Sequence, residues 1–469
     1  MSHIRGESRT QATMFPEALD DLITESAQVR VIDAFVGTLK MAKLGFARAV
    51  PATTGRPGYD PSDLLKLYVY GYLNQVRSSR RLEREAARNV ELLWLLNKLR
   101  PDFKTIADFR RDNVRAIVGA CRSFTVFCRE QGLFGAELVA IDGSKFQAAA
   151  SRKQVWTPKR LAQAQTAIDQ RIREYLQALD QSDATEPAAS AEATQAALAA
   201  LKEQSERLQS ISHQLQDESQ YVASEPDAKL MRTAHSGFQV AYNVQTAVDA
   251  KHSLIAEFAV TQDGNDHQQL SPIAQAVKRA LHATQLTVLA DSGYQNGEQA
   301  QACEDQGITP IAPASASINP KGEFFSKDQF RYDARVDQYT CPAGQALTRY
   351  KSAQRQHTHY YTTKACANCV LKAQCTKSKQ RSIVRDFHAD ALERMNQRAK
   401  DHPALMARRK AIVEHPFAGL KYLLGTPRFL VRGLQKTSAE IALCVLGYNL
   451  KRTINILGAA HIKRACASA

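Results

Sequence analysis

Long apolar runs are missing from this chain of 469 residues. The longest one near the C-terminus, Ile441–Leu446, is far shorter than the roughly 20 residues that a membrane-spanning helix needs. The first eight residues also lack the apolar segment of a secretory signal. We therefore expect neither membrane insertion nor secretion. In a reducing cytoplasm the nine Cys are expected to be thiols or metal ligands, not disulfides.

Acidic residues are outnumbered, and the imbalance is uneven along the chain. The sequence has 62 Lys and Arg against 47 Asp and Glu, a net charge of +15. Residues 401–469 hold eleven basic and three acidic side chains, whereas residues 161–230 hold five basic and twelve acidic ones. This pattern fits a polyanion partner such as nucleic acid, and it fits equally a basic protein with one solvated acidic hairpin. Charge alone leaves the partner open.

Residues 1–130 are expected to form an all-α N-terminal domain. Helix N-caps precede three of its segments, at Asp60-Pro61, Ser78-Ser79 and Asp102. Short helices with exposed arginines such as Arg80 and Arg81 are typical of a helix-turn-helix-like DNA reader. An ordinary helical bundle has the same spacing, so the pattern does not choose between the two.

Residues 131–469 are expected to form an α/β catalytic domain with two insertions. With residues 151–230 set aside, the order is strand, strand, strand, helix, strand, helix, strand, which is that of an RNase H-like mixed sheet flanked by helices. The 151–230 insertion is predicted to be an acidic helical hairpin with a flexible tip near residues 185–190. The expected elements are a strand at 138–141 that ends at Asp142, strands at 237–249 and 253–261, a helix capped by Asp266 over 267–282, a strand at 286–290 that ends at Asp291, a helix, and a short strand at 309–312.

Two carboxylates, Asp142 and Asp291, each follow a buried strand of this sheet. Asp is common at such positions because it prefers turns, but ligands of open α/β sheets also bind where strand ends meet. Neighbouring carboxylates repel each other unless a cation lies between them. Two Mg²⁺ or Mn²⁺ ions, about 3.5–4 Å apart, would stabilise both oxygens of a phosphodiester displacement.

Such a site normally needs a third acidic residue, for which Glu414 is the best candidate. Lys410 and Lys421 lie four residues before it and seven after it, on the same face if the segment is helical. Pro416 removes a backbone donor, so we expect the helix to kink or restart just after Glu414. Taken alone, Glu414 has the pattern of an exposed helical residue among basic ones. Beside the two strand-end aspartates it completes a candidate metal site.

Seven short motifs then follow one another along nearly the whole chain. Together they resemble the bacterial insertion-sequence transposases of the DDE type, in the group numbered eleven-eighty-two. The motifs are Ser78–Leu82, Asp102–Arg110, Ile141–Lys145, Ala290–Tyr294, Val413–Phe417, Arg432–Leu434 and Tyr448–Arg452.

The resemblance implies an enzyme that cuts insertion-sequence ends and joins the freed 3′-hydroxyl to target DNA. Asp142, Asp291 and Glu414 would be both its catalytic residues and its Mg²⁺ ligands. The partner would be double-stranded DNA, bound by a homodimer because both ends must be held together, in the nucleoid region of the cytoplasm. The expected DNA-binding residues are Arg80, Arg81, Arg408, Arg409, Lys410 and Lys421.

Related transposases carry a Tyr-x2-Arg-x3-Glu-x6-Lys signature around the third acid. Here Glu414 and Lys421 match it, while Lys410 stands at the Arg position, so Arg408 or Arg409 would have to supply the guanidinium. Two alternatives stay open. One is a catalytically silent DNA-binding regulator derived from a transposase, and the other is a stand-alone RNase H-like nuclease.

The cysteines fall into two groups. The segment 325–385 is predicted to be a small Cys-rich insertion with the spacing C-x24-C-x2-C-x5-C, which suits a structural Zn²⁺ site in a region with little apolar core. Four unbound thiols are the alternative, and His357 or His359 could replace one ligand. The zinc candidates are Cys341, Cys366, Cys369 and Cys375, whereas Cys121, Cys128, Cys303, Cys444 and Cys466 are expected to be core residues.

Overall fold

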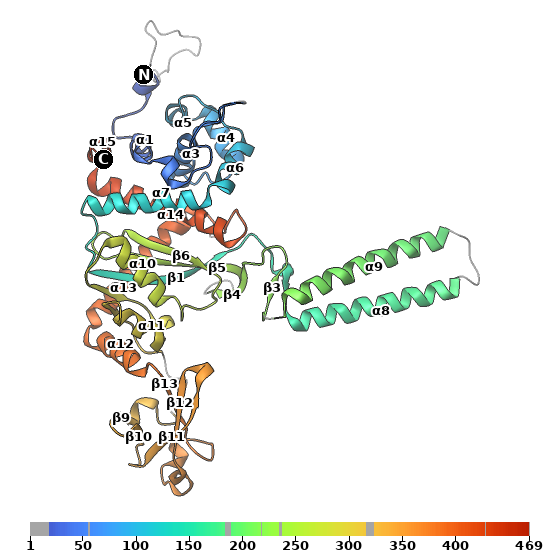
Figure 1. Cartoon of the computed structure of the whole chain (residues 1–469), viewed down its shortest axis with the longest axis vertical. Coiled ribbons are helices and arrows are strands. Elements are labelled where there is room, and N and C mark those ends of the chain that lie inside the picture. Colours follow the sequence, from blue (N-terminus) through green and yellow to red (C-terminus); the bar gives the residue numbers. More distant parts are fainter. Residues whose placement is uncertain are drawn as a thin grey trace, which may run out of the picture.

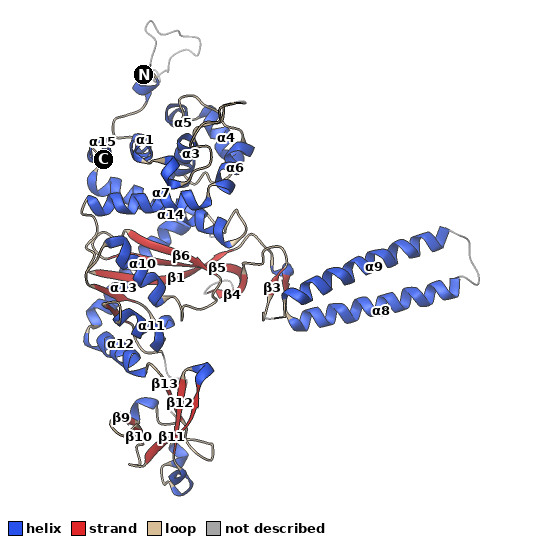
Figure 2. Cartoon of the chain, in the orientation of Figure 1, coloured by secondary structure: helices blue, strands red, loops and turns tan. Residues whose placement is uncertain are grey.

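The chain is elongated, with a helical layer at one end, a sheet in the middle, a small β unit at the other end and a helical arm at the side (Figure 1). A computed structural model describes residues 18–54, 57–182, 189–216, 218–233, 237–315, 323–426 and 428–468. Figure 2 shows that strands are confined to the middle layer, the foot of the arm and the small β unit. Short 3₁₀ helices are η1 Leu19–Leu22, η2 Arg152–Gln154, η3 Ser292–Tyr294, η4 Lys327–Gln329, η5 Gln354–Gln356, η6 Lys364–Asn368 and η7 Lys372–Gln374.

The N-terminal layer is helical, as the capping pattern predicts. The Asp60 carboxylate accepts a hydrogen bond from Ser62 N at 2.7 Å, and that of Asp102 accepts from Lys104 N and Thr105 N at 2.9 Å each. These caps satisfy backbone donors that the first helical turn leaves free. The helices are α1 Gln28–Thr38, α2 Met41–Leu44, α3 Pro61–Leu73, α4 Ser79–Arg88, α5 Val90–Leu95, α6 Phe103–Asp112 and α7 Val114–Glu130.

The two ends of the chain share one hydrophobic core. Helix α14 (Leu434–Leu457) packs against α3 and α7, and α15 (Ala459–Ala467) packs against α1. The apolar run Ile441–Leu446 is completely buried in α14. A buried ion pair, 3.0 Å between Arg77 and Glu440, joins the α3–α4 turn to α14. No helix in the described ranges is long and apolar enough to cross a membrane.

The middle layer is a six-stranded mixed sheet whose strand order β4-β5-β1-β7-β8, with β6 on β5, confirms the predicted RNase H-like arrangement. Strand β1 runs antiparallel to β5 and parallel to β7. The sheet is flanked by α10 and α11 and by α13, which packs on β1 and β5. The elements are β1 Leu138–Gln147, β4 Lys229–Thr233, β5 Gly237–Asp249, β6 Ile255–Thr261, β7 Leu286–Leu289, β8 Ile308–Ile311, α10 Leu270–Leu281, α11 Gly297–Glu304, α12 Ala389–Asp401 and α13 Pro403–Leu424.

Two local predictions are wrong. Strand β1 does not end at Asp142 but continues to Gln147, because antiparallel pairing with β5 carries it past the end of its parallel pairing with β7. Helix α13 neither stops nor restarts after Glu414 but runs through Pro416 to Leu424. One face of the helix around Pro416, with Val413, Pro416 and Phe417, is buried, so tertiary packing outweighs the lost backbone hydrogen bond.

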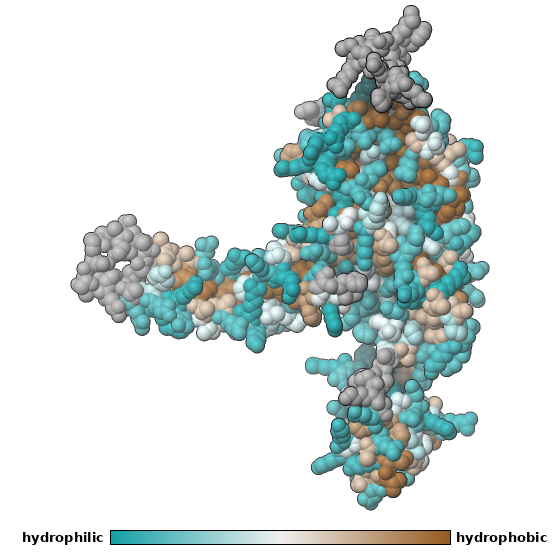
Figure 3. Space-filling model, turned by 180° about the vertical axis from the view of Figure 1, so that it is seen from behind, coloured by the Kyte–Doolittle hydropathy of each residue, from teal (hydrophilic) through white to brown (hydrophobic). Residues whose placement is uncertain are grey.

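The 151–230 insertion is an arm of two long helices, as predicted. Helices α8 (Pro158–Ser182) and α9 (Ala189–Gln214) pack side by side, with a small apolar cluster at their base around Leu161 and Leu208. Two short strands, β2 (Val155–Trp156) and β3 (Tyr221–Val222), close the arm where it joins the sheet. Figure 3 shows hydrophobic and hydrophilic residues interspersed along the arm. The predicted flexible tip lies largely outside the described residues.

The Cys-rich insertion is a separate five-stranded antiparallel sheet, in the order β13-β12-β11-β10-β9. Its own small core contains Phe330, Tyr339, Leu347, Tyr361 and Ile383. The five cysteines predicted to lie in the main core are all buried, which confirms that prediction. The strands are β9 Arg331–Asp333, β10 Gln338–Thr340, β11 Ala346–Ala353, β12 Thr358–Thr362 and β13 Ile383–Asp386.

Candidate active site

Strand register brings Asp142 and Asp291 to the same edge of the sheet. Ala140 on β1 pairs with Leu289 on the parallel strand β7, and each aspartate lies two residues beyond its paired residue. The Asp291 carboxylate accepts a hydrogen bond from Gly293 N at 2.7 Å, which fixes the turn after β7. The sequence therefore located this pair correctly on neighbouring parallel strands.

Asp142 is held in surroundings that disfavour its charge. The pKa of Asp142 is raised to about 6, chiefly by burial; the nearby Asp291 and Asp266 contribute to this rise, and Arg409 opposes it. The Arg409 Nη1 to Asp142 Oδ2 distance is 3.6 Å. That Nη1 atom is buried and has no hydrogen-bond partner among the residues described. Asp142 therefore keeps excess negative potential that a bound cation would relieve.

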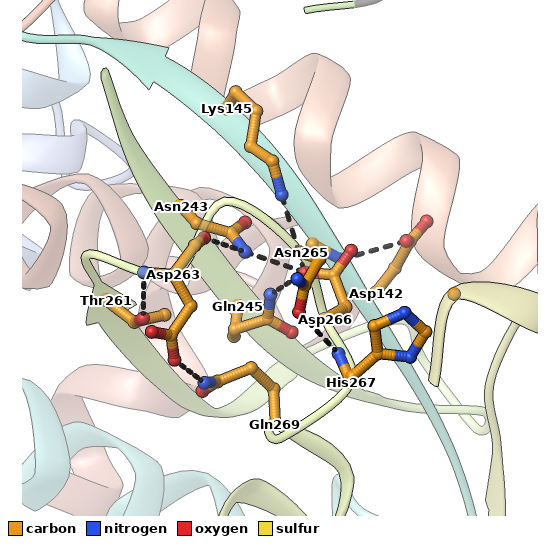
Figure 4. Close-up of polar contacts among 12 residues, drawn as sticks. Asp142, Lys145, Asn243, Gln245, Thr261, Asp263, Asn265, Asp266, His267 and Gln269 are labelled. Carbon is orange, nitrogen blue, oxygen red and sulfur yellow. Dashed lines mark hydrogen bonds and ion pairs between the residues drawn. The ribbon is translucent and has the colours of Figure 1, made fainter. Parts of the chain in front are cut away.

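Asp266 is a third aspartate of this region, and the sequence assigned it a different role. Helix α10 begins at Leu270 with Gln269 as its N-cap, so Asp266 does not cap the helix. Its Oδ1 instead accepts hydrogen bonds from Asn243 Nδ2 and Gln245 Nε2, both at 2.6 Å (Figure 4). Both amide residues are completely buried. The capping prediction failed because two side chains of the distant strand β5 bind Asp266 more closely than the helix end does.

Lys145 completes the surroundings of Asp266, since its Nζ lies 3.5 Å from Asp266 Oδ1. In the β1–β5 register Lys145 pairs with Asn243 and Gly143 pairs with Gln245, so these residues share one face of the sheet. Asp142 pairs with Thr246 and therefore points to the opposite face, toward α13. Asp266 thus lies beneath the strand that carries Asp142.

Two glycines allow the carboxylates to approach the backbone this closely. A Cβ on Gly143 would lie 2.4 Å from Gln245 Nε2 and 2.7 Å from Asp266 Oδ1. A Cβ on Gly293 would lie 2.9 Å from Asp291 Oδ1 and 3.7 Å from Asp266 Oδ2. A glycine one or two residues after each aspartate was the sequence signal that a further group packs against the backbone there.

Glu414 pairs with Lys410 at 3.5 Å, as the four-residue spacing predicts, and its side chain is 63% exposed. Lys421 on the same helix reaches β1, with its Nζ 6.0 Å from the centre of the Phe146 ring. The face of α13 that carries Glu414 therefore borders the strand of Asp142. Across the described ranges, however, no three His, Cys, Asp or Glu side chains are arranged to hold a metal ion.

The predicted DNA-binding residues differ in what they contact. Arg409 points into the carboxylate site and is only 15% exposed, whereas Arg408 donates to the carbonyl of Ala250 at 3.2 Å. On α4, Arg80 and Arg81 are exposed, and the Arg80 guanidinium lies 4.9 Å from the ring centre of Phe103. These two arginines remain available to a partner in solution.

The four cysteines of the small β unit, far apart in the sequence, line one pocket. Burial raises the pKa of Cys375, and the other three thiols are close enough to raise it further. The sulfur of Cys341 accepts a hydrogen bond from Gln345 N at 3.3 Å in a turn where Gly344 has a φ of +73°. The predicted grouping of these residues is therefore present, and their metal binding stays a prediction.

Taken together, the mixed sheet and its strand-end carboxylates define an RNase H-like α/β protein. The family model of a transposase DDE domain matches residues 340–454, and that of a transposase domain (DUF772) matches residues 17–112. Two separate parts of the chain are therefore similar to transposase domains. The DDE match begins at residue 340, so it includes Glu414 but neither Asp142 nor Asp291.

Comparisons with whole proteins add little to this assignment. No curated protein sequence matches the chain. Among solved structures, the piggyBac transposase synaptic complex with hairpin DNA, determined by cryo-electron microscopy, is similar at 8% identity and a TM-score of 0.34. That likeness covers 94% of this chain and 79% of the other. It is too weak to carry any argument here.

Proposed function

We propose that this chain is a transposase that cuts the ends of an insertion sequence and joins the freed 3′-hydroxyl to target DNA. The observation that carries the proposal is the convergence of Asp142 and Asp291 at the same edge of parallel strands, with the pKa of Asp142 raised to about 6. A carboxylate with a raised pKa beside a second carboxylate, where the parallel pairing of an α/β sheet ends, is typical of a catalytic centre. The matches to two transposase domains give the reaction class.

The donor set fits Mg²⁺ or Mn²⁺, because these hard cations prefer carboxylate oxygens. Asp142 and Asp291 would hold the ions, and Glu414 would complete the set by turning from its solvent-exposed pairing with Lys410. When bound, such ions activate water or a 3′-hydroxyl and stabilise the leaving oxygen of a phosphodiester. Asp266 does not ligate in this proposal, since its Oδ1 already accepts two amide hydrogen bonds and lies beneath the strand.

The basic side chains around the site would hold the DNA. Arg409 offers a bidentate fork and would pass from Asp142 to a phosphate near the cut once cations neutralise the carboxylate. Lys421 and Lys410 border the same face of α13 and would contact the flanking backbone. The exposed Arg80 and Arg81 of α4 would contact the element end, and a homodimer would hold both ends together.

The thiol pocket would hold a structural Zn²⁺ ion once its four sulfurs draw together, because no three of them surround a common metal position in the described residues. Four sulfur ligands suit that metal, and the sulfur of Cys341 accepts an amide hydrogen bond of the kind that supports metal-bound sulfur. A zinc ion would add folding free energy to a unit whose core contains five buried residues.

Two other functions remain distinguishable from this one. A silent regulator would bind DNA without cutting it, and a stand-alone nuclease would cut without joining. The raised pKa of Asp142 favours an active site over a silent one, since a regulator has no use for a buried carboxylate of this kind.

The test is Mg²⁺- or Mn²⁺-dependent nicking of DNA that carries the element's own end, taken from inverted repeats beside the coding region. Asp142→Asn, Asp291→Asn and Glu414→Gln should each abolish nicking and retain DNA binding. Asp169→Asn, an exposed position on α8, is the matched control and should nick normally. Nicking that survives Asp142→Asn would contradict the proposal. Binding without any nicking by the unaltered chain would favour the regulator, and nicking without joined products would favour the nuclease.

A further inference from the structure

The outer face of the small five-stranded sheet presents aromatic and basic side chains to solvent. Residues paired across antiparallel strands point to the same side. Lys351 pairs with Tyr360, and Tyr360 also pairs with Val384, so all three lie on one face. Tyr361 follows Tyr360 and Ile383 precedes Val384, so this second pair points to the opposite face, into the small core. The first three side chains are therefore not part of that core.

A β-bulge adds a fourth side chain to this outer face. The pairing of β11 with β12 shifts between Arg349 and Lys351, which leaves Tyr350 unpaired in the ladder. Its ring lies 6.2 Å from that of Tyr360, edge to face, and is 57% exposed. The Lys351 Nζ lies 5.7 Å from the centre of the Tyr360 ring. Two tyrosine rings and one ammonium group thus form a contiguous solvent-facing surface.

The charge of the unit indicates which partner would cover this surface. Residues 323–386 carry twelve Lys and Arg and five Asp and Glu, a net charge of +7. Lys364, Lys377 and Lys379 are exposed in the same unit. One of its acidic groups, Asp337, is already engaged by Arg349 and by the hydroxyl of Tyr332. A negatively charged polymer with flat aromatic groups would complement both the positive charge of the unit and the rings of Tyr350 and Tyr360.

We propose that Tyr350, Lys351 and Tyr360 form a binding face for unpaired DNA. The tyrosine rings stack on bases, and Lys351 contacts the adjoining phosphate. Bases within a duplex are covered by their neighbours, so ring stacking selects strands that are open, as they are beside a cut element end. This inference rests on the proposed function, because only strand cleavage or opening supplies unpaired DNA near this unit.

The experiment compares binding of the full-length chain to one labelled oligonucleotide, single-stranded and as a duplex, by fluorescence anisotropy without added Mg²⁺ or Mn²⁺ and without a chelator, so that zinc in the unit is retained. Tyr350→Ala and Tyr360→Ala should each weaken single-strand binding about fivefold to a hundredfold, and should change duplex binding far less. Tyr350→Phe keeps the ring and should bind like the unaltered chain. Tyr175→Ala removes a tyrosine that is 38% exposed on the arm and is the matched control.

Lys351→Gln gives an independent readout. It should reduce the slope of log affinity against log salt by about 0.7 for single-stranded DNA. Thermal melts of each variant establish that the exposed substitutions leave the fold intact.

The outcomes separate this inference from the proposed function. Unchanged single-strand affinity in both tyrosine-to-alanine variants, with duplex binding intact, overturns the inference alone. Equal weakening of single-strand and duplex binding overturns it too, because the face would then be a general phosphate contact. A change in sedimentation without a change in DNA binding would assign the face to a second protein copy. Failure of the unaltered chain to bind any DNA counts against the proposed function itself.

Discussion

Removing the charge of Asp142 should stabilise the metal-free protein while it abolishes catalysis. The folded-state pKa of Asp142, about 6, lies above the ordinary value of 3.8, so the folded state resists its ionisation. The difference between these two pKa values corresponds to a destabilisation of the ionised folded protein by about 3 kcal/mol, at about 1.4 kcal/mol per pKa unit. The attraction of Arg409 is already included in the folded-state pKa. Asn resembles the neutral acid in shape, so Asp142→Asn should recover up to about 3 kcal/mol.

The sign of this effect fixes its pH dependence. Above pH 6 the unaltered protein carries the full cost of the charged carboxylate, and the cost shrinks between 6 and 3.8 and vanishes below 3.8. At about pH 7.5 the variant should therefore melt about 3 °C higher, given an unfolding entropy of about 1 kcal/mol/K for a chain of this length. At about pH 4 the two melting temperatures should nearly coincide.

The assay is differential scanning calorimetry in EDTA at both pH values, with Asp169→Asn as the exposed control that should not shift. Added Mg²⁺ should raise the melting temperature of the unaltered chain and leave that of Asp142→Asn unchanged, because only the former keeps the ligand. A variant that is no more stable than the unaltered chain at pH 7.5 would refute the view that Asp142 is held against its preference.

Further substitutions probe the other contacts. Gly143→Ala places a methyl group against the side-chain amide of Gln245. It should lower the free energy of unfolding by about 1–3 kcal/mol in a thermal melt and strongly reduce nicking in the DNA assay. Asp266→Ala removes the acceptor of two buried amides and should cost about 3 kcal/mol by thermal melt. Glu440→Gln leaves Arg77 buried without its counter-ion and should cost about 3–5 kcal/mol in urea unfolding. Cys369→Ser should lower bound zinc in elemental analysis, whereas normal zinc content in that variant would exclude it as a ligand.

Features set by neighbours in sequence were predictable. Asp60 and Asp102 cap helices because the groups that they bind lie two or three residues away. The placement of Asp142 and Asp291 just after apolar runs on two strands of the sheet followed from the lengths of those runs, and the order of elements then selected the sheet. The fold class was thus readable from local patterns and their order.

Features set by distant partners were not predictable. Asp266 had a helix-cap pattern, yet Asn243 and Gln245 on β5 bind it across the sheet. Pro416 predicted a break, but burial of α13 against β1 and β5 keeps the helix continuous. Arg409 was expected to contact DNA, and only the packing of α13 turns it toward Asp142. In each case tertiary contact overrides a correct local preference.

The burial of α14 between α3 and α7 has a consequence for synthesis. A ribosome completes the first seven helices long before residues 434–467 emerge, so until then those helices lack the partner that covers their apolar sides. A prematurely terminated product would retain Arg80 and Arg81 but expose the apolar sides of α3 and α7. It would therefore be a substrate for chaperones and proteases. The N-terminal helices therefore depend for their stability on the last residues to be synthesised.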